Sequence, residues 1–455
     1  MSEAPQRAVL VLSPYWAPTR VTGLWRPLRF CRYLQEFGWS PTILSPRSED
    51  IFHHLPPQDK ALSVPELPLI RPEVPLLSGR LCTQSARLGS AVDRLLDPLL
   101  PPQEEETQRR YPRRPGAFFE KSILRLIRRS QLPDPLSEWG ISIARRLDQG
   151  ALPELSALQG KVDAVWVTGG PFGAFVAGAL IAERLRSALV LDYRDMWNCD
   201  HDTSHRPLFA PRSFVRAIER WALRRARAVS YIHQPCLEGN QRLFGQSEES
   251  RWEVIPNGFD SIDLGAAAPL RESTCNLLHA GNFYGSRSLR PCLEALEMLD
   301  DTAGVLRLET FGQIDRAALD WLAPRSLPEE RFLHHPPVDA EEIGARLRGA
   351  SALLLVIGET HREALSAKLY DYLAAGRPII AYGPKDAAAR PLIESLGAAG
   401  VWVESGDLDG LKRAYLDLIS GKLEAPEEPP QQLHARARAR ELAELLSWAA
   451  ERGPL

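Results

Sequence analysis

The chain has 455 residues, 44% of them hydrophobic and 25% charged, and its formal net charge is −3. This length and composition indicate a globular protein with more than one core, so we expect two domains and no nucleic acid partner. The six cysteines are scattered, without a Cys-x-x-Cys pair or histidines at metal-ligand spacing, which argues against a disulfide framework and a zinc site.

Residues 1–46 predict one strand–helix–strand unit. The buried strand AVLVLSP leads through the loop PYWAPTRVTG into the helix LWRPLRFCRYLQEFG and the strand SPTILSP. The start lacks the basic residues and the long apolar run of a signal peptide. The best candidate for a membrane span, Val162 to Ala182, contains Asp163 and a Gly-Gly-Pro break, which favour a strand, a turn and a helix. We therefore expect a cytoplasmic protein.

The stretch from Pro41 to Pro135 holds fifteen of the 38 prolines and shows no clean alternation of strands and helices. We interpret residues 47–135, approximately, as an insertion in the first domain. Within it, residues 118–130 combine aromatic and aliphatic side chains with lysine and arginine. A helix of this kind can lie on an anionic membrane surface. The alternative is a helix packed on its own domain with solvated arginines.

Short apolar strands alternate with helices along the rest of the chain. We expect strands at Ala164 to Thr168, Ala188 to Tyr193, Ala228 to Ile232, Trp252 to Ile255, Asn276 to Ala280, Val305 to Phe311, Ala352 to Ile357 and Pro378 to Tyr382. This pattern predicts two doubly wound, Rossmann-like parallel sheets with ligand sites at the carboxyl ends of their strands. With one domain facing the other, the cleft between them is the expected site.

The predicted domains are residues 1–265 and residues 266–432, with a linker from Gly265 to Thr274 where small residues, proline and charges collect. Residues 433–455 predict a final amphipathic helix, with Leu442, Leu445, Leu446 and Trp448 as its apolar stripe. A spacer rich in proline and glutamate precedes this helix, so the helix could pack back on the first domain.

The segment EALSAKLYDYLAAGRP, residues 363–378, carries the clearest functional pattern. Ser366 is a candidate N-cap and Gly376 with Pro378 forms a stop signal, which together predict a short helix. The free backbone amides at the start of that helix, with Lys368 in its first turn, favour a phosphate-sized anion. Asp371 lies about one turn further in, placed for hydroxyl groups, so we infer a nucleoside diphosphate site. An ordinary capped surface helix remains the alternative.

Four segments together resemble glycosyltransferases with the GT-B fold, and among them the large retaining family 4. They are SPYWAPTRVTGLWRP near the start, VLDYRDMW with its Arg-Asp-x-Trp run, VIPNGFD before the linker, and SAKLYDYLAAGRPIIAY. Their order and spacing carry the resemblance, which covers nearly the whole chain and is weakest across residues 47–160.

In this family an acidic pair separated by seven residues serves the donor, and Glu363 and Asp371 have that spacing. The first acid approaches the sugar and the second binds the ribose; Asp371 is one methylene shorter than the usual Glu. The rest of the site is expected in HAGNFYGSRSLRP, where Asn282 replaces a common Arg and Arg287 lies near the place of a Lys. A solvated Arg287 is the alternative. The expected donor-binding residues are Gly23, Gly281, Asn282, Arg287, Ser366, Lys368, Leu369 and Asp371.

On the acceptor side we expect Arg26, Arg194 and Asp195. Many relatives have a histidine near this point that contacts the sugar, and this chain has Arg-Asp instead, so that role is not carried over. Asp195 would orient or deprotonate an acceptor hydroxyl; it could equally cap the following helix or pair with Arg194. The expected catalytic residues are Asp195, Glu363, Arg287 and Lys368.

The resemblance implies a retaining glycosyltransferase of bacterial surface polysaccharide or glycolipid assembly, with a nucleotide sugar as co-substrate and no metal or other cofactor. Its acceptor would be a sugar or a lipid-linked glycan, reached through peripheral contact with the cytoplasmic membrane face. Two alternatives stay open. One is a GT-B nucleotide-sugar 2-epimerase, which needs carboxylate and histidine groups at the hexose C2. The other is a binding module that keeps the fold without the chemistry.

Overall fold

The computed structural model describes residues 6–19, 21–47, 64–74, 134–198, 212–264, 275–299, 306–325, 327–338, 340–363, 365–426 and 428–455. The chain divides into two compact units, Met1–Pro256 with Ala439–Leu455, and Asn257–Arg438. The predicted linker and most of the predicted insertion, including residues 118–130, lie outside the described residues.

The first unit is built on a parallel sheet of seven strands in the order β3-β2-β1-β4-β5-β6-β7. The strands are β1 (Arg7–Leu12), β2 (Trp39–Leu44), β3 (Leu69–Ile70), β4 (Ala164–Gly169), β5 (Ala188–Tyr193), β6 (Ala228–Tyr231) and β7 (Arg251–Val254). Every residue of β4 and β5 is buried, as expected for central strands covered on both faces.

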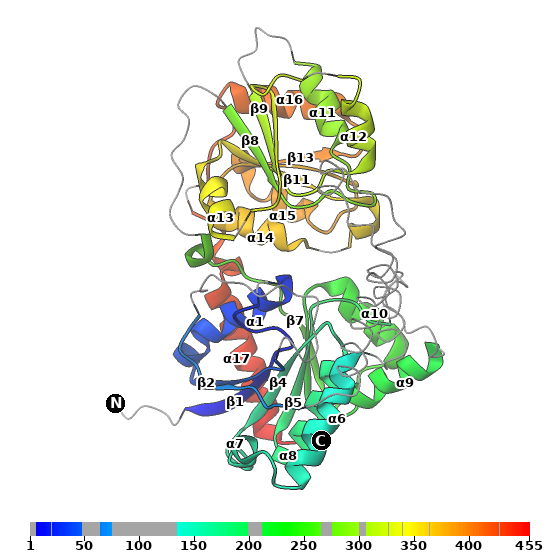
Figure 1. Cartoon of the computed structure of the whole chain (residues 1–455), viewed down its shortest axis with the longest axis vertical. Helices are drawn as coiled ribbons and strands as arrows, with labels where there is room; N and C mark the ends of the chain where they lie inside the picture. Colours follow the sequence, from blue (N-terminus) through cyan, green and yellow to red (C-terminus); the bar gives the residue numbers. More distant parts are fainter. Residues whose placement is uncertain are drawn as a thin grey trace, which may run out of the picture. The chain divides into compact units, whose positions relative to one another are not determined.

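Helices cover both faces of this sheet (Figure 1). They are α1 (Thr22–Tyr33), α6 (Pro135–Asp148), α7 (Pro153–Ser156), α8 (Gly173–Leu185), α9 (Arg212–Leu223), α10 (Gln234–Phe244) and α17 (Ala435–Arg452). One core layer joins the sheet to α6 and α8, and the other joins it to α1 and α17. The doubly wound prediction is confirmed for this unit.

The last helix, α17, begins in the second unit and packs against the first. Leu442, Leu445 and Leu446 are fully buried there. The indole nitrogen of Trp39 donates to the carbonyl of Ala443 at 3.2 Å. The predicted return of a C-terminal helix to the first sheet is therefore confirmed.

The second unit has six parallel strands in the order β10-β9-β8-β11-β12-β13. They are β8 (Cys275–Ala280), β9 (Leu306–Phe311), β10 (Phe332–His335), β11 (Ala352–Val356), β12 (Ile379–Gly383) and β13 (Gly400–Glu404). The sequence predicted the four inner strands and missed β10 and β13. Both lie at the edges of the sheet, where burial is incomplete and the apolar run is correspondingly weak.

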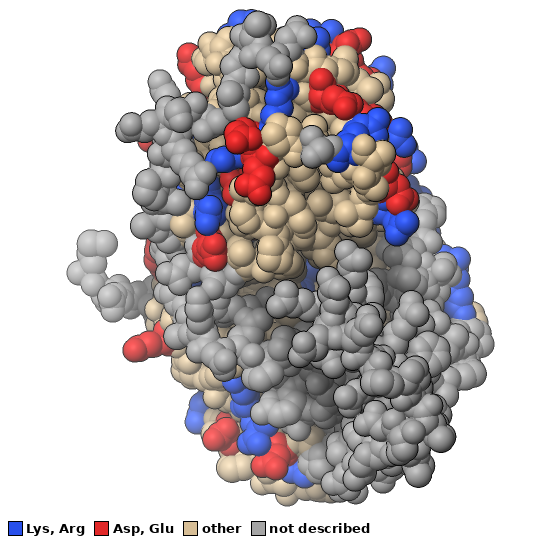
Figure 2. Space-filling view, turned by 45° about the horizontal axis from the view of Figure 1, so that its top comes forward, with Lys and Arg blue, Asp and Glu red and all other residues tan. Residues whose placement is uncertain are grey.

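Helices α11 (Arg290–Glu297), α12 (Arg316–Leu322) and α16 (Leu408–Ile419) cover one face of the second sheet. Helices α13 (Ala340–Gly349), α14 (Ala367–Ala375) and α15 (Arg390–Glu394) cover the other. None of the helices in the described residues is both long and apolar enough to cross a bilayer. On the face drawn in Figure 2, basic and acidic side chains lie beside one another rather than forming one continuous basic field.

A buried ion pair links helix α1 to the centre of the first sheet. Arg26 donates to both carboxylate oxygens of Asp192, at 2.8 and 2.9 Å, and the two side chains are only 3% and 0% exposed. Ser230 on β6 donates to the same carboxylate at 2.7 Å, and Arg26 also donates to the carbonyl of Pro256 at 2.9 Å. These bonds compensate the desolvation of both charges.

Asp192→Ala should lower the free energy of unfolding by about 3–5 kcal/mol, because it leaves Arg26 buried without a counter-charge. Denaturant unfolding followed by circular dichroism measures the loss. The double variant Arg26→Met/Asp192→Leu, which removes both charges, should recover most of it. A single-variant loss below about 1 kcal/mol would show that the pair does not hold α1 to the sheet.

Candidate functional site

Helix α14 begins and ends where its local sequence predicts. Ser366 is the N-cap residue and Gly376 closes the helix with φ 62° and ψ 39°. The Ser366 hydroxyl, however, makes no capping hydrogen bond, although its carbonyl accepts from the Leu369 amide at 3.0 Å. The N-cap side chain therefore does not occupy the first backbone amides of the helix, and such amides can bind an anion.

The side chain of Lys368 reaches from α14 to the end of β8. Its ammonium lies 3.3 Å from Nε2 of His279, and its Cε lies against Gly281. A Cβ at Gly281 would lie 2.3 Å from that Cε, and Gly281 has φ 121°, a conformation that only glycine adopts readily. Gly281 is therefore required both for the turn and for the passage of Lys368.

Arg287 supplies a second cation to the same place. Its guanidinium donates to the Tyr284 hydroxyl at 3.0 Å and lies 5.2 Å from the centre of that ring. Burial, and then the positive charge of Arg287, lower the pKa of Lys368 to about 8. From the sequence we expected these two cations to bind the diphosphate together. In the structure they are close enough for the charge of one to affect the pKa of the other.

The loops after β8, β9 and β11 meet at this edge of the sheet. The side-chain oxygen of Asn282 accepts from the Gln313 amide at 2.9 Å, across from Gly312 with φ 125°. A Cβ at Gly358, after β11, would lie 2.9 Å from the backbone nitrogen of Arg287. The side chain of Asn282 thus holds two loops together, and its expected contact with the donor stays a prediction.

The remaining expected donor residues differ in how far they are exposed to solvent. Asp371 lies half-buried one turn into α14, and Glu363 is exposed in the preceding loop. The Leu369 side chain is fully buried in the core, and its amide already donates to Ser366. Any contact of Leu369 with a ligand would therefore be made through its backbone, and its donor role stays a prediction.

In the first unit, Arg194 is a framework residue rather than a free cation. It is 8% exposed and donates to the carbonyls of Gly169 at 2.7 Å, Gly23 at 2.5 Å and Gly170. A Cβ at Gly23 would lie 2.3 Å from the Arg194 guanidinium. Gly23, expected to bind the donor, makes room for Arg194, and Arg194 joins the start of α1 to the loops after β4 and β5.

Arg26, also expected on the acceptor side, is buried as well. Its guanidinium is bound by Asp192 on β5, so it joins helix α1 to the sheet. Asp195 is the exposed member of the expected acceptor group. A Cβ at Gly170 would lie 2.7 Å from a carboxylate oxygen of Asp195, which places this acid beside the loop after β4.

A buried acid holds the loop that carries Asp195. Glu219 on α9 is fully buried and accepts hydrogen bonds from Asn198 at 2.5 Å and from the Tyr193 hydroxyl at 2.9 Å. Burial raises the pKa of Glu219 to about 7. Trp197, in the same loop, stacks on Phe172 with ring centroids 4.8 Å apart. The loop is thus fixed on both sides of Asp195.

His279 is the site residue that the sequence reasoning missed. It is 1% exposed and its ring contacts the ammonium of Lys368. The available signal was a histidine just before the glycine turn that ends β8, opposite a lysine in the first turn of a helix. That signal was weak, because pairing the two required knowledge of the sheet order.

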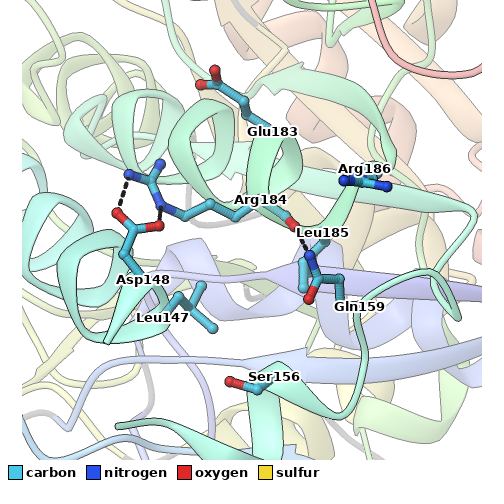
Figure 3. Close-up of a pocket in the computed structure, with 8 residues that line it drawn as sticks. All are labelled: Leu147, Asp148, Ser156, Gln159, Glu183, Arg184, Leu185 and Arg186. Carbon is cyan, nitrogen blue, oxygen red and sulfur yellow. Dashed lines mark hydrogen bonds and ion pairs between the residues drawn. The ribbon is translucent and has the colours of Figure 1, made fainter. Parts of the chain in front are cut away.

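A surface pocket of about 410 Å³ lies elsewhere, between the C-terminal ends of α6 and α8 (Figure 3). Asp148 and Arg184 form an ion pair of 2.7 Å in its wall. Because α8 ends just before β5 begins, this pocket lies toward the amino ends of the strands. Ligands of such sheets bind at the opposite, carboxyl ends, so we assign this pocket no role.

Comparison with known proteins identifies the family and the fold of this chain. The family described as "Glycosyl transferase 4-like domain" matches residues 22–258, just over half of the 455 residues. No curated protein matches the sequence significantly.

Solved structures similar to this chain include a trehalose-phosphate synthase from Burkholderia xenovorans in complex with glucose-6-phosphate (TM-score 0.55, 13% identity, 97% of this chain and 100% of that chain). A sucrose-phosphate synthase from Thermosynechococcus elongatus has TM-score 0.54 and 13% identity over 98% and 96% of the two chains. HepE from Anabaena in complex with UDP-glucose has TM-score 0.53 and 15% identity over 97% and 99%. At such identities the likeness shows the fold alone, which is GT-B.

Gly281→Ala should lower the free energy of unfolding by about 2–4 kcal/mol, since its Cβ needs the space of Lys368 and a backbone conformation disfavoured for alanine. The matched control is Gly285→Ala, at φ 59° with nothing within 4 Å of the added Cβ. It should cost about 1 kcal/mol. Equal losses in the two variants, measured by denaturant unfolding, would contradict the close approach of Lys368.

Proposed function

This chain belongs to the glycosyl transferase 4-like family and is a glycosyltransferase, and from that premise we propose that it transfers a sugar from a nucleoside diphosphate to an acceptor hydroxyl with retention of configuration. The observation that carries the proposal is the meeting of Lys368, Arg287 and the uncapped start of α14 at the carboxyl edge of the second sheet. Two cations and free helix amides suit a diphosphate better than any neutral ligand.

The chemistry proposed for this site is assisted departure of the diphosphate. The bond between the sugar C1 and the β-phosphate oxygen breaks, and C1 bonds to the acceptor oxygen on the same face. The cations and amides bind the negative charge that grows on the leaving phosphate, so stabilisation increases toward the transition state. The acceptor hydroxyl gives up its proton as the new bond forms.

We propose that Asp195 orients the acceptor hydroxyl or receives its proton, because it is an exposed carboxylate on a loop fixed by Glu219. For Glu363 we propose contact with the donor sugar, and for Asp371 contact with the ribose, on the strength of their family spacing. The similar structures in complex with UDP-glucose and with glucose-6-phosphate support a sugar nucleotide donor and a sugar acceptor. We further propose that the acceptor belongs to surface polysaccharide or glycolipid assembly.

The epimerase alternative would need a histidine at the hexose C2. The buried His279 lies behind Lys368 and its ring is engaged by that ammonium and by Leu354, so it does not favour this chemistry. The non-catalytic alternative is decided by turnover. Binding of a sugar nucleotide without sugar transfer or hydrolysis on any acceptor would favour a binding module.

Lys368→Ala and Arg287→Ala should each weaken nucleoside diphosphate binding by about tenfold or more, because each removes a charged hydrogen-bond donor from the phosphates. Titration calorimetry with a panel of UDP, dTDP, GDP and ADP measures the affinity. Asp195→Ala should lower turnover and leave this affinity nearly unchanged. Lys422→Ala, a surface lysine of the same unit bonded to Asp417, is the control. Undisturbed affinity in the first two variants would refute the donor site.

Diphosphate affinity should also fall as the pH rises from 7 to 9. The lowered pKa of Lys368, about 8, means that the free protein loses this positive charge across that range, so binding must take up a proton. In Lys368→Ala the fall should disappear. A pH-independent affinity in the wild-type protein, or an equal fall in the variant, would show that Lys368 does not meet the phosphates.

A further inference from the structure

The buried ring of His279 lies beside the Lys368 ammonium. It is the last residue but one of β8 and is 1% exposed. Its ring stacks on Phe283 with centroids 4.1 Å apart and an interplanar angle of 27°. Burial and stacking thus restrict the orientation of the ring.

The hydrogen bonds of His279 fix its tautomer. Nδ1 lies 2.8 Å from the carbonyl oxygen of Leu354 on β11, and a carbonyl can only accept, so Nδ1 carries the hydrogen. Burial, and then the charge of Lys368, hold the pKa of His279 well below its ordinary value, and Arg287 adds to this effect. The ring is thus neutral, with a bare Nε2 as hydrogen-bond acceptor.

Nε2 lies 3.3 Å from Nζ of Lys368, which can only donate when protonated. On its other side the ammonium lies against Gly281, where a Cβ would come within 2.5 Å of Nζ. An ammonium has three N–H groups, and the bond to His279 uses one of them. The imidazole and the Gly281 backbone together confine the charge to one place.

The hydrogen-bond acceptor of Lys368, Nε2 of His279, carries no negative charge, and this affects anion binding. A carboxylate in the place of His279 would also hold the ammonium, but it would cancel the positive charge that an anion needs. A neutral imidazole nitrogen orients the lysine and leaves its charge uncompensated. The other polar and charged groups facing this pair are the Gly281 backbone, which hydrogen-bonds to His279, the Arg287 guanidinium, and the hydroxyl of Tyr372, which donates to the same Leu354 carbonyl at 3.2 Å.

We propose that His279 is a positioning residue of the donor site, whose neutral Nε2 accepts a hydrogen bond from Lys368 and fixes that ammonium where the diphosphate meets it. The proposal rests on the proposed function, since it assigns a further role within the same site. His279 itself does not touch the ligand.

The test compares two amides of different length. In His279→Asn the amide can still donate to Leu354, but its side chain is too short to reach Lys368. In His279→Gln the longer side chain brings an acceptor oxygen to the place of Nε2. We expect His279→Asn to weaken nucleoside diphosphate binding about tenfold at pH 7, and His279→Gln to remain within about threefold of wild type. The matched control, His334→Asn, changes a histidine on β10 that pairs with Thr310 and should leave binding unchanged.

The outcomes separate the two hypotheses. If Lys368→Ala does not weaken binding, or no nucleoside diphosphate binds the wild-type chain, the donor site itself fails. If Lys368→Ala weakens binding and His279→Asn does not, only the positioning role fails. Equal losses in the Asn and Gln variants would also overturn it, because that result assigns His279 to packing alone.

A measurement on the unmodified full chain covers the case in which the variants do not fold. The ¹⁵N chemical shifts of labelled histidine, assigned to His279, report which ring nitrogen carries hydrogen. We expect hydrogen on Nδ1 and a bare Nε2 throughout the range from pH 6 to 8. A protonated ring, or hydrogen on Nε2, would overturn the proposal.

Discussion

One half-buried cation, the Lys368 ammonium, lies at the centre of the proposed chemistry, held at the carboxyl end of β8 between His279 and Gly281. Parallel strands bring the loops after β8, β9 and β11 to the same edge, and α14 then points its N-terminus at that edge. Burial normally penalises such a charge, and the lowered pKa of Lys368 shows that it does so here. A site that keeps a partly desolvated cation beside a second one is organised in advance for an anion.

In the first unit, in contrast, the buried charged groups are paired with other groups of the protein. Arg26 is bound to Asp192, Arg194 to three backbone carbonyls, and Glu219 to two side-chain donors, all with little exposure. These groups fix the start of α1 and the loops after β4 and β5. Only Asp195, of the expected acceptor-side residues, stays exposed. The unit thus uses its buried charges for rigidity and presents one carboxylate on the loop they support.

Local patterns in the sequence were sufficient for some features and not for others. The residues at which α14 starts and stops, Ser366 and Gly376, were predicted from the local sequence, although the Ser366 hydroxyl makes no capping hydrogen bond. The inner strands follow from apolar runs. The framework roles of Arg26 and Arg194 depend on partners 166 and 171 residues away, which no local pattern reveals. His279 is separated from Leu354 by 75 residues and from Lys368 by 89, so its role becomes visible only once β8, β11 and α14 are adjacent.

The most direct test of the central claim is a crystal structure of the full chain with a bound nucleoside diphosphate. We predict that β-phosphate oxygens lie within hydrogen-bond distance of Nζ of Lys368 and of backbone amides at the start of α14, with His279 still behind the lysine. A nucleotide bound in the first unit, or one whose phosphates lie away from Lys368, would contradict this claim.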